Sequence, residues 1–195
     1  FARDARRTVD DRPYGGGPGM VLKPEPLFEA VESVRTPEAR VVLMTPQGRR
    51  FEQAAARRLA HLSHLVLVCG HYEGFDERIR ASLADEELSI GDYVLTNGAL
   101  PAAVVGDAVV RLRPNVLGGG EAASREESFT EGMLEHPQYT RPPEFRGMRV
   151  PEVLLSGHHA EMATWRKERA QGRTARKRPD LLTGKAARNR ATKQE

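Results

Sequence analysis

"RVVLMTPQGRRFEQAAARRLAHLSHLVLVCG", residues 40–70, gives the clearest structural signal in this chain of 195 residues. It begins and ends with continuous aliphatic runs, at 40–46 and 64–70, and such runs are typical of strands buried on both faces. The segment between them, 51–63, is rich in Ala, Leu and Arg at helical spacing. The pattern therefore predicts a β-α-β unit with two parallel strands.

The flanking residues continue the same alternation. We predict a helix over 25–34 and a third, short strand over 89–95. A further helix is predicted over 100–112, with one apolar face made by Val104, Val105, Ala108, Val109 and Leu112. The expected fold class is α/β with a parallel sheet, and the residues by themselves favour an unknotted, doubly wound arrangement.

Each predicted strand is followed by a polar or glycine-containing loop. The loops are TPQGR at 45–49, GHYEGFDER at 70–78 and TNG at 96–98. Because ligands of α/β sheets collect at the carboxyl ends of strands, we expect a binding site there. The sequence holds neither the P-loop motif nor the dinucleotide fingerprint. The glycine-rich run DDRPYGGGPGM at 10–20 fits either a flexible turn or a loop that approaches a nucleotide closely.

The second half of the chain has a different texture. Residues 113–152 combine glycine, proline and charge without apolar periodicity, and we assign 113–155 as a linker. Helical spacing returns in a predicted domain over 156–195, with Ser156 as N-cap and Glu161 in the first turn. Residues 157–195 hold eleven Lys or Arg against four Asp or Glu. This charge favours a polyanionic partner, and a solvated helix face is the alternative.

Composition excludes several classes of protein. Cys69 is the one cysteine, so no internal disulfide can form, and its apolar surroundings indicate a buried, inert thiol. No uninterrupted apolar run approaches the roughly 18 residues of a membrane span, and no secretion signal opens the sequence, so we expect a cytoplasmic protein without membrane contact. His158 and His159 are adjacent, without the spacing of zinc ligands, and no metal site is predicted.

Several motifs together resemble one known family. RTVDDRPYGGGPGM, TPQGR, CGHYEGFDERI, SIGDYVL, VPEVLLSGHHAE and RPDLL occur in this order over nearly the whole chain. They resemble the bacterial tRNA (guanine-N1)-methyltransferase family, TrmD, of the SPOUT superfamily. The family has a further strand-bearing segment ahead of these motifs, and this sequence resembles a member without it. The resemblance implies that 1–112 form an α/β domain with a C-terminal trefoil knot, joined by the linker to a basic, tRNA-binding helical domain.

The same resemblance implies S-adenosyl-L-methionine as cofactor, held in the knot largely by backbone groups of the three loops. Carried over by position, the cofactor-binding residues are Leu43, Met44, Pro46, Gly70, Glu73, Ser89, Ile90, Gly91, Tyr93, Leu95 and Gly98. Core packing is the alternative role for Ile90, Tyr93 and Leu95. TNGA at 96–99 departs from the family, which usually has Gly-Gly-Glu after the first residue, so Asn97 can alter the methionine end of the pocket.

Methylation of guanine N1 needs a base that removes the N1 proton and a cation that stabilises charge on O6. The resemblance implies Glu127, where the family has aspartate, as the base, with Glu126 in reserve, and Arg111 as the cation. The implied target is the guanosine immediately 3′ of the tRNA anticodon, in composite active sites of a homodimer, with Mg²⁺ as a possible requirement. Implied substrate-binding residues are Asp10, Asp11, Arg12, His136, Tyr139 and Arg141, and implied tail contacts to tRNA are Trp165, Arg166, Arg169, Arg173 and Arg176.

Trp165 can equally anchor the core of the tail. Two other functions stay open at this point. One is an RNA-binding module without catalysis, and the other is a nucleotide hydrolase with a phosphate-binding glycine loop. The absence of a P-loop lysine weighs against the hydrolase.

Overall fold

The computed structural model describes residues 1–118 and 127–183. By contacts, the chain divides into two compact units, Phe1–Gly118 and Gly119–Glu195. The predicted division at 112 and 155 stays a prediction. Among the described residues, no helix combines the length and the hydrophobicity needed to span a lipid bilayer.

The first unit is built on a parallel sheet of three strands in the order β4-β3-β5. β3 (Arg40–Arg50) lies in the centre, between β4 (Leu65–Cys69) and β5 (Glu86–Ser89). Val41 pairs with Val66 on one side, and Val42 pairs with Glu86 on the other. The two parallel strands predicted from residues 40–70 are confirmed.

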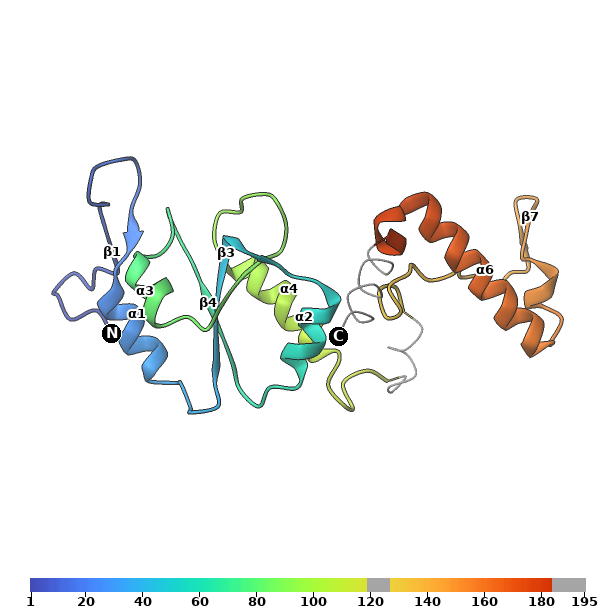
Figure 1. Ribbon diagram of the computed structural model, residues 1–195, viewed down its shortest axis with the longest axis horizontal. Helices are drawn as coiled ribbons and strands as arrows, with labels where there is room; N and C mark the ends of the chain where they lie inside the picture. The colour runs from blue at the N-terminus through green and yellow to red at the C-terminus, as the bar shows by residue number, and fades with distance from the viewer. Residues whose placement is uncertain (119–126, 184–195) are drawn as a thin grey trace, which may run out of the picture. The chain divides into compact units, whose positions relative to one another are not determined.

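Alternating side chains of β3 enter two separate apolar cores. Val41 and Leu43 pack in one cluster, beneath α1 (Pro24–Glu32) and α3 (Glu77–Ser82), and Val42 and Met44 pack in the other. The second cluster is covered by α2 (Gln53–Ala60) and α4 (Ala99–Val110). Figure 1 shows these helix pairs on opposite sides of the sheet. Because both faces of β3 are covered, its aliphatic run needs no polar alternation.

The expected α/β class with a parallel sheet is confirmed, while several local predictions are wrong. The third strand is Glu86–Ser89, so the predicted range 89–95 is mostly loop. The Ser89 hydroxyl donates to the Gly91 carbonyl (2.9 Å) and accepts from the Gly91 amide (3.2 Å), and this turn ends the strand. On α4, Val105 and Val109 are buried as predicted, but Val104 is 48% exposed because it lies to one side of the contact face.

The segment TPQGR is also not a loop after the strand. β3 continues to Arg50, and its register against β5 shifts between Met44 and Arg49, both of which pair with Leu88. Residues 45–48 therefore form a bulge within β3. A Cβ at Gly48 would collide with the backbone of Leu88, so only glycine allows β5 to approach the bulge this closely.

Two short strands precede the sheet. β1 (Asp10–Asp11) and β2 (Val21–Leu22) pair antiparallel, and the glycine-rich run connects them. Gly15, Gly16 and Gly19 have φ values of +86°, +81° and +78°. This left-handed conformation explains the run of glycines, since other residues adopt it only with strain.

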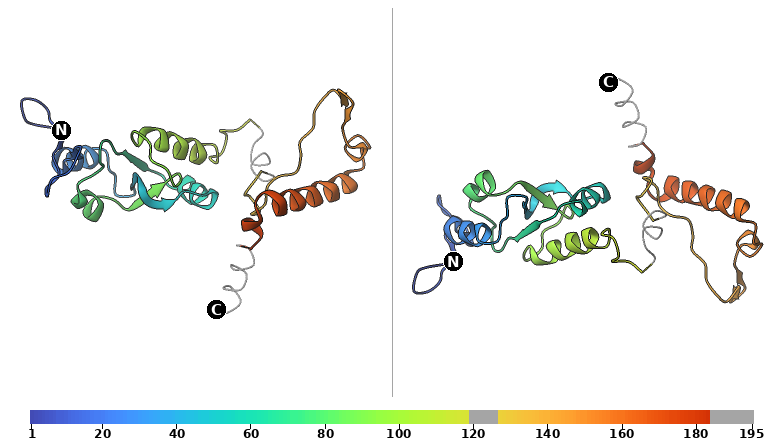
Figure 2. Two further views of the ribbon diagram at one scale, coloured as in Figure 1. Left: turned by 90° about the horizontal axis from the view of Figure 1, so that it is seen from above. Right: turned by 90° about the horizontal axis from the view of Figure 1, so that it is seen from below.

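The second unit is organised along α6 (His159–Lys177). Before it lie the hairpin β6 (Glu144–Phe145) and β7 (Met148–Arg149) and the 3₁₀ turn η1 (Glu152–Leu154). Figure 2 shows the chain running out to the hairpin and α6 returning alongside it. The helix begins after His158, so Ser156 is not the N-cap. Its hydroxyl instead accepts from the His158 amide (3.1 Å) and closes the preceding turn, while Glu161 lies in the first turn as predicted.

Part of the predicted linker contacts this helix. The amide of Leu134 donates to the hydroxyl of Thr174 (2.9 Å), which is fully buried on α6. Arg173 donates to the carbonyl of Glu135 (3.3 Å). These contacts hold the segment around residues 134–135 against the helix.

Candidate functional site

A cavity of about 330 Å³ lies where the three strands of the sheet end. Its walls come from the β3 bulge, the 70–75 loop after β4, and the 88–98 segment that runs from β5 to α4. This volume is within the range of small-molecule sites, which begins at about 300 Å³. The three predicted strand-end segments therefore meet around one cavity.

The lining includes all predicted cofactor-binding residues except Leu43. Leu43 is fully buried between its β4 and β5 neighbours and belongs to the core, because strand alternation turns its side chain away. The predicted residues that line the cavity are Met44, Pro46, Gly70, Glu73, Ser89, Ile90, Gly91, Tyr93, Leu95 and Gly98. Their contact with a cofactor, like that of Leu43, stays a prediction.

Gly98 brings two backbone segments together at one wall. Its amide donates to the Gly70 carbonyl (2.8 Å). A Cβ at position 98 would lie 2.7 Å from the Gly70 nitrogen and 2.8 Å from Cys69 Cα. Both neighbours are backbone atoms and cannot rotate away, so this wall of the cavity requires glycine.

The glycine-rich run is attached to the same cavity. The Glu73 amide donates to the Met20 carbonyl and the Leu22 amide to the Gly74 carbonyl, each at 2.9 Å. A Cβ at Gly19 would lie 2.6 Å from Glu73 Cγ. Residues 19–22 therefore pack directly on the 71–75 loop, and the glycine run lies next to the cavity.

Replacing Gly19 with alanine is expected to displace Glu73 and to lower the affinity of the cavity for its ligand by about tenfold. Gly15→Ala is the matched control, because Gly15 has a similar positive φ but nothing lies within 4 Å of its added Cβ. Both variants strain the backbone, so ligand titration isolates the contact with Glu73. Equal affinities for the two variants would contradict this coupling.

The residue-by-residue assignment covers about half of the lining, and most of the other lining residues lie in the three strand-end segments where a binding site was expected. Asn97 is one of these and departs from the family. Its side chain accepts from the Ala99 amide (2.9 Å) and so caps the start of α4. Arg80 had no signal, because α3 was not predicted to follow the 70–78 loop. The lining residues absent from the predicted set are Thr45, Gln47, His71, Tyr72, Gly74, Phe75, Arg80, Leu88, Val94, Thr96, Asn97 and Pro101.

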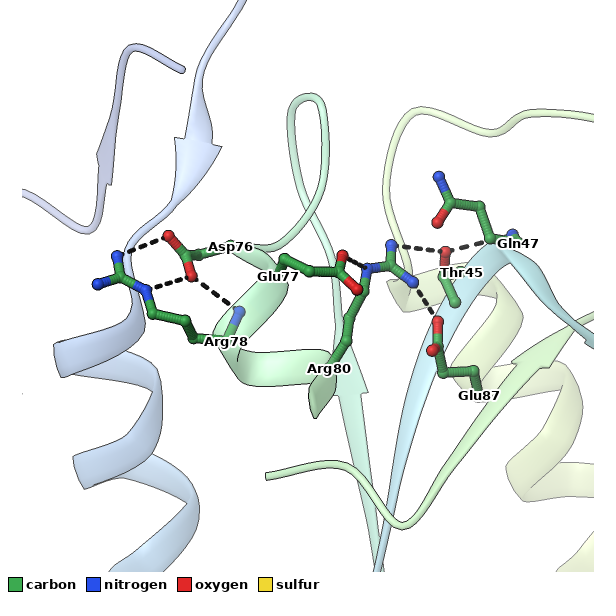
Figure 3. Close-up of polar contacts among 7 residues, drawn as sticks. All are labelled: Thr45, Gln47, Asp76, Glu77, Arg78, Arg80 and Glu87. Atoms are coloured by element: carbon green, nitrogen blue, oxygen red, sulfur yellow. Dashed lines mark hydrogen bonds and ion pairs between the residues drawn. The ribbon is translucent and has the colours of Figure 1, made fainter. Parts of the chain in front are cut away.

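Two arginines of α3 make different ionic contacts, which Figure 3 shows. Asp76 is the N-cap of the helix and accepts from the Arg78 amide (2.9 Å) and guanidinium (2.8 Å). Chiefly through the side-chain hydrogen bond from Arg78, the pKa of Asp76 lies below its ordinary value. This contact therefore stabilises the fold at neutral pH and is lost as pH falls through the lowered pKa. Arg80 points the other way, toward Thr45 and Glu87.

Cys69 lies at the end of β4, beside the cavity wall. Burial raises the pKa of its thiol, so the thiol stays protonated at neutral pH. A protonated thiol is a poor nucleophile, which agrees with the inert role expected from sequence.

The second unit holds an aromatic group around Trp165 of α6. The rings of His136 and Tyr139 each lie 6.4 Å from the Trp165 ring, and Arg169 lies over it at 5.6 Å. Tyr139 is exposed, and a groove beside it is lined by His136 and Arg141 among others. Trp165 thus anchors the 136–139 segment to the helix. This is the structural role considered for it, and a contact with RNA stays a prediction.

The predicted catalytic residues belong to different units. Arg111 follows α4 directly in the first unit, and Glu127 is half-buried beside a pocket of the second. Their convergence stays a prediction, and Glu126 lies outside the described residues. Asp10 and Asp11 form β1, and the amide of the exposed Arg12 donates to Asp11 Oδ1 (2.7 Å). Across the described ranges, no group of three His, Cys, Asp or Glu could hold a metal ion.

Comparison with known proteins gives a consistent set of relatives. The sequence model of the family described as "tRNA (Guanine-1)-methyltransferase TrmD" matches residues 1–184. A tRNA (guanine-N(1)-)-methyltransferase of Geobacillus kaustophilus is 58% identical over 184 residues, covering 93% of this chain and 75% of the relative. Proteins with the same name from Moorella thermoacetica and Gloeobacter violaceus are each 58% identical, over 93% and 95% of this chain and 74% and 82% of their own lengths.

Proposed function

Because the chain belongs to the tRNA (guanine-1)-methyltransferase TrmD family, we propose that it transfers a methyl group from S-adenosyl-L-methionine to guanine N1 in tRNA. We place the target guanosine immediately 3′ of the anticodon. The observation that carries the proposal is the family match over residues 1–184, together with a strand-end cavity lined by the residues predicted for the cofactor.

The residues that line the cavity suit the chemistry of this cofactor. Ile90, Tyr93 and Leu95 supply apolar surface suited to an adenine ring. The close backbone approach at Gly98 leaves the wall free of side-chain bulk. Glu73 adds a carboxylate at the edge of the cavity, which suits a positively charged ligand. When bound, the cofactor supplies an electrophilic methyl group on its sulfonium.

The remaining chemistry is assigned to side chains of this chain. Neutral guanine carries a proton on N1, so the nitrogen becomes nucleophilic as that proton leaves. The Glu127 carboxylate accepts the proton, and the Arg111 guanidinium stabilises the negative charge that develops on O6. Glutamate in place of the family's aspartate keeps the carboxylate and adds one methylene of reach. The two residues lie in different units, and we propose a composite site in a homodimer, where one subunit supplies the cavity and its partner the carboxylate.

We assign tRNA binding to both units. Asp10, Asp11 and Arg12 begin the glycine-rich run, and the other end of this run packs beside the cavity. We assign these three residues to contacts with the target nucleotide. In the second unit, aromatic and basic groups that are exposed or half-buried suit a looped RNA strand, because unpaired bases stack on aromatic rings while cations pair with phosphates. The groups assigned there are His136, Tyr139, Arg141, Trp165, Arg166, Arg169, Arg173 and Arg176. The trefoil knot of the SPOUT superfamily, a Mg²⁺ requirement and a cytoplasmic location complete the proposal.

A methyl-transfer assay tests this function directly. Radiolabelled S-adenosylmethionine is supplied with two tRNA transcripts that differ only at the position 3′ of the anticodon, one with guanosine and one with adenosine. We expect label only in the guanosine transcript. Binding of both transcripts without transfer would favour the non-catalytic RNA-binding module, and label in both would contradict the assigned target.

A further inference from the structure

Arg80 has an unusual position for a long cationic side chain. It lines the cavity from α3, and its side chain is only 11% exposed. Arginine is rarely buried unless its charge is paired. The contacts of its guanidinium therefore indicate what the residue does at the cavity.

Those contacts join three elements of the first unit. The guanidinium forms an ion pair with Glu87 of β5, and its Nε lies 3.6 Å from Glu77 of its own helix. Nη2 donates to the Thr45 hydroxyl in the β3 bulge (3.3 Å). Figure 3 shows the guanidinium between Thr45 and Glu87. Two carboxylates pair with the charge, and the guanidinium also lies 6.0 Å from the centre of the Phe75 ring, which lines the cavity. The Nη2 contact with Thr45 is its hydrogen bond to the β3 bulge.

The Thr45 hydroxyl holds the β3 bulge in shape through the hydrogen bonds that it accepts. Its hydroxyl also accepts from the Gln47 amide (3.3 Å), which closes a turn across Pro46. Met44, Thr45, Pro46 and Gln47 all line the cavity, so the turn determines one complete wall. A hydroxyl can accept two hydrogen bonds, and here both hold the same turn.

We propose that Arg80 is a positioning residue for the cofactor cavity, which holds the 45–48 bulge in its binding conformation through the Thr45 hydroxyl. The inference rests on the proposed function, because it takes S-adenosylmethionine and related nucleosides as the ligands of the cavity. Arg80 acts through Thr45 and does not pair with the ligand itself.

The test uses ligand titration with S-adenosylhomocysteine and with 5′-methylthioadenosine, which lacks the amino-acid portion. Arg80→Gln is expected to raise the Kd of both ligands by a similar factor, on the order of tenfold, while the KM for tRNA is unchanged. Arg80→Lys is expected to recover part of the loss, since lysine can still donate to Thr45. Arg78→Gln is the matched control, because Arg78 lies on the same helix, pairs with Asp76 and is not part of the lining.

Thr45→Val provides the second arm. It should raise both Kd values at least as much as Arg80→Gln does, because it removes the hydrogen bond from Arg80 and also the one from the Gln47 amide. Adding Arg80→Gln to it should have little further effect, because the Arg80–Thr45 hydrogen bond is already lost. Additive losses would overturn the proposal, as would equal weakening by Arg78→Gln. A loss confined to S-adenosylhomocysteine would also overturn it, since Arg80 would then contact the amino-acid portion. Wild-type protein that binds neither ligand would refute the proposed function as well, whereas normal binding by Arg80→Gln would refute only the positioning role.

Discussion

Gly98→Ala is expected to abolish tight binding of S-adenosylmethionine. The added Cβ meets the backbone of Cys69 and Gly70 at 2.7–2.8 Å, so the loop before α4 must move away from the end of β4. A shift of about 1 Å at a positioned reactant can lower rate by about 100-fold, and we expect at least this loss in kcat/KM for the cofactor. Titration calorimetry and initial rates at varied cofactor concentration measure the two effects.

Gly106→Ala is the control for this change. Gly106 lies inside α4, and nothing lies within 4 Å of its added Cβ. Alanine is the better helix former by about 1 kcal/mol, so the control should bind normally and melt at the same or a higher temperature. If Gly98→Ala bound the cofactor as tightly as Gly106→Ala, the close approach of these backbones would not shape the binding site.

Glu127→Gln is expected to lower kcat by about 10²–10⁴-fold, because a neutral amide cannot accept the N1 proton. The affinity for the cofactor should not change, since Glu127 is not part of the cavity lining. Glu127→Asp keeps the carboxylate and introduces the aspartate that the resemblance implies for this position, so this variant should keep substantial activity. Single-turnover methyl transfer at saturating tRNA separates this chemical step from binding.

Glu131→Gln is the matched control, an exposed carboxylate four residues further along the same segment. It should leave kcat unchanged. Full activity of Glu127→Gln would contradict the assignment, and loss of activity in Glu126→Gln would then move the base to the neighbouring carboxylate.

The sheet was predictable because its strands are buried on both faces. Val41, Val42, Leu43 and Met44 all enter an apolar core, so the continuous aliphatic run carried an unambiguous signal. The third strand was predicted too far along the chain. It lies at Glu86–Ser89 and begins with two glutamates, so it gives no continuous apolar run in the sequence. A glutamate can lie in an edge strand when an arginine pairs with it, as Arg58 does with Glu86 (2.6 Å). Because the two residues are distant in sequence, the local pattern gives no sign of this pairing.

The cavity was predictable from where the strands end, and its finer geometry was not. Residues that the resemblance implies for the cofactor, such as Pro46, Gly70 and Gly98, line the cavity, and their contact with a cofactor stays a prediction. The hydrogen bond from Arg80 to Thr45 of the β3 bulge joins residues 35 positions apart, and no local pattern encodes such a contact. Leu43 is also carried over by position, and its side chain lies in the core, which a position in a motif does not reveal.

A crystal structure of the protein with bound S-adenosylmethionine tests the central claim most directly. We predict density for the ligand in the cavity between the β3 bulge, the loop after β4 and the segment before α4, in contact with Pro46, Gly70 and Gly98. A structure with this cavity empty and the ligand bound elsewhere on the chain would contradict the account.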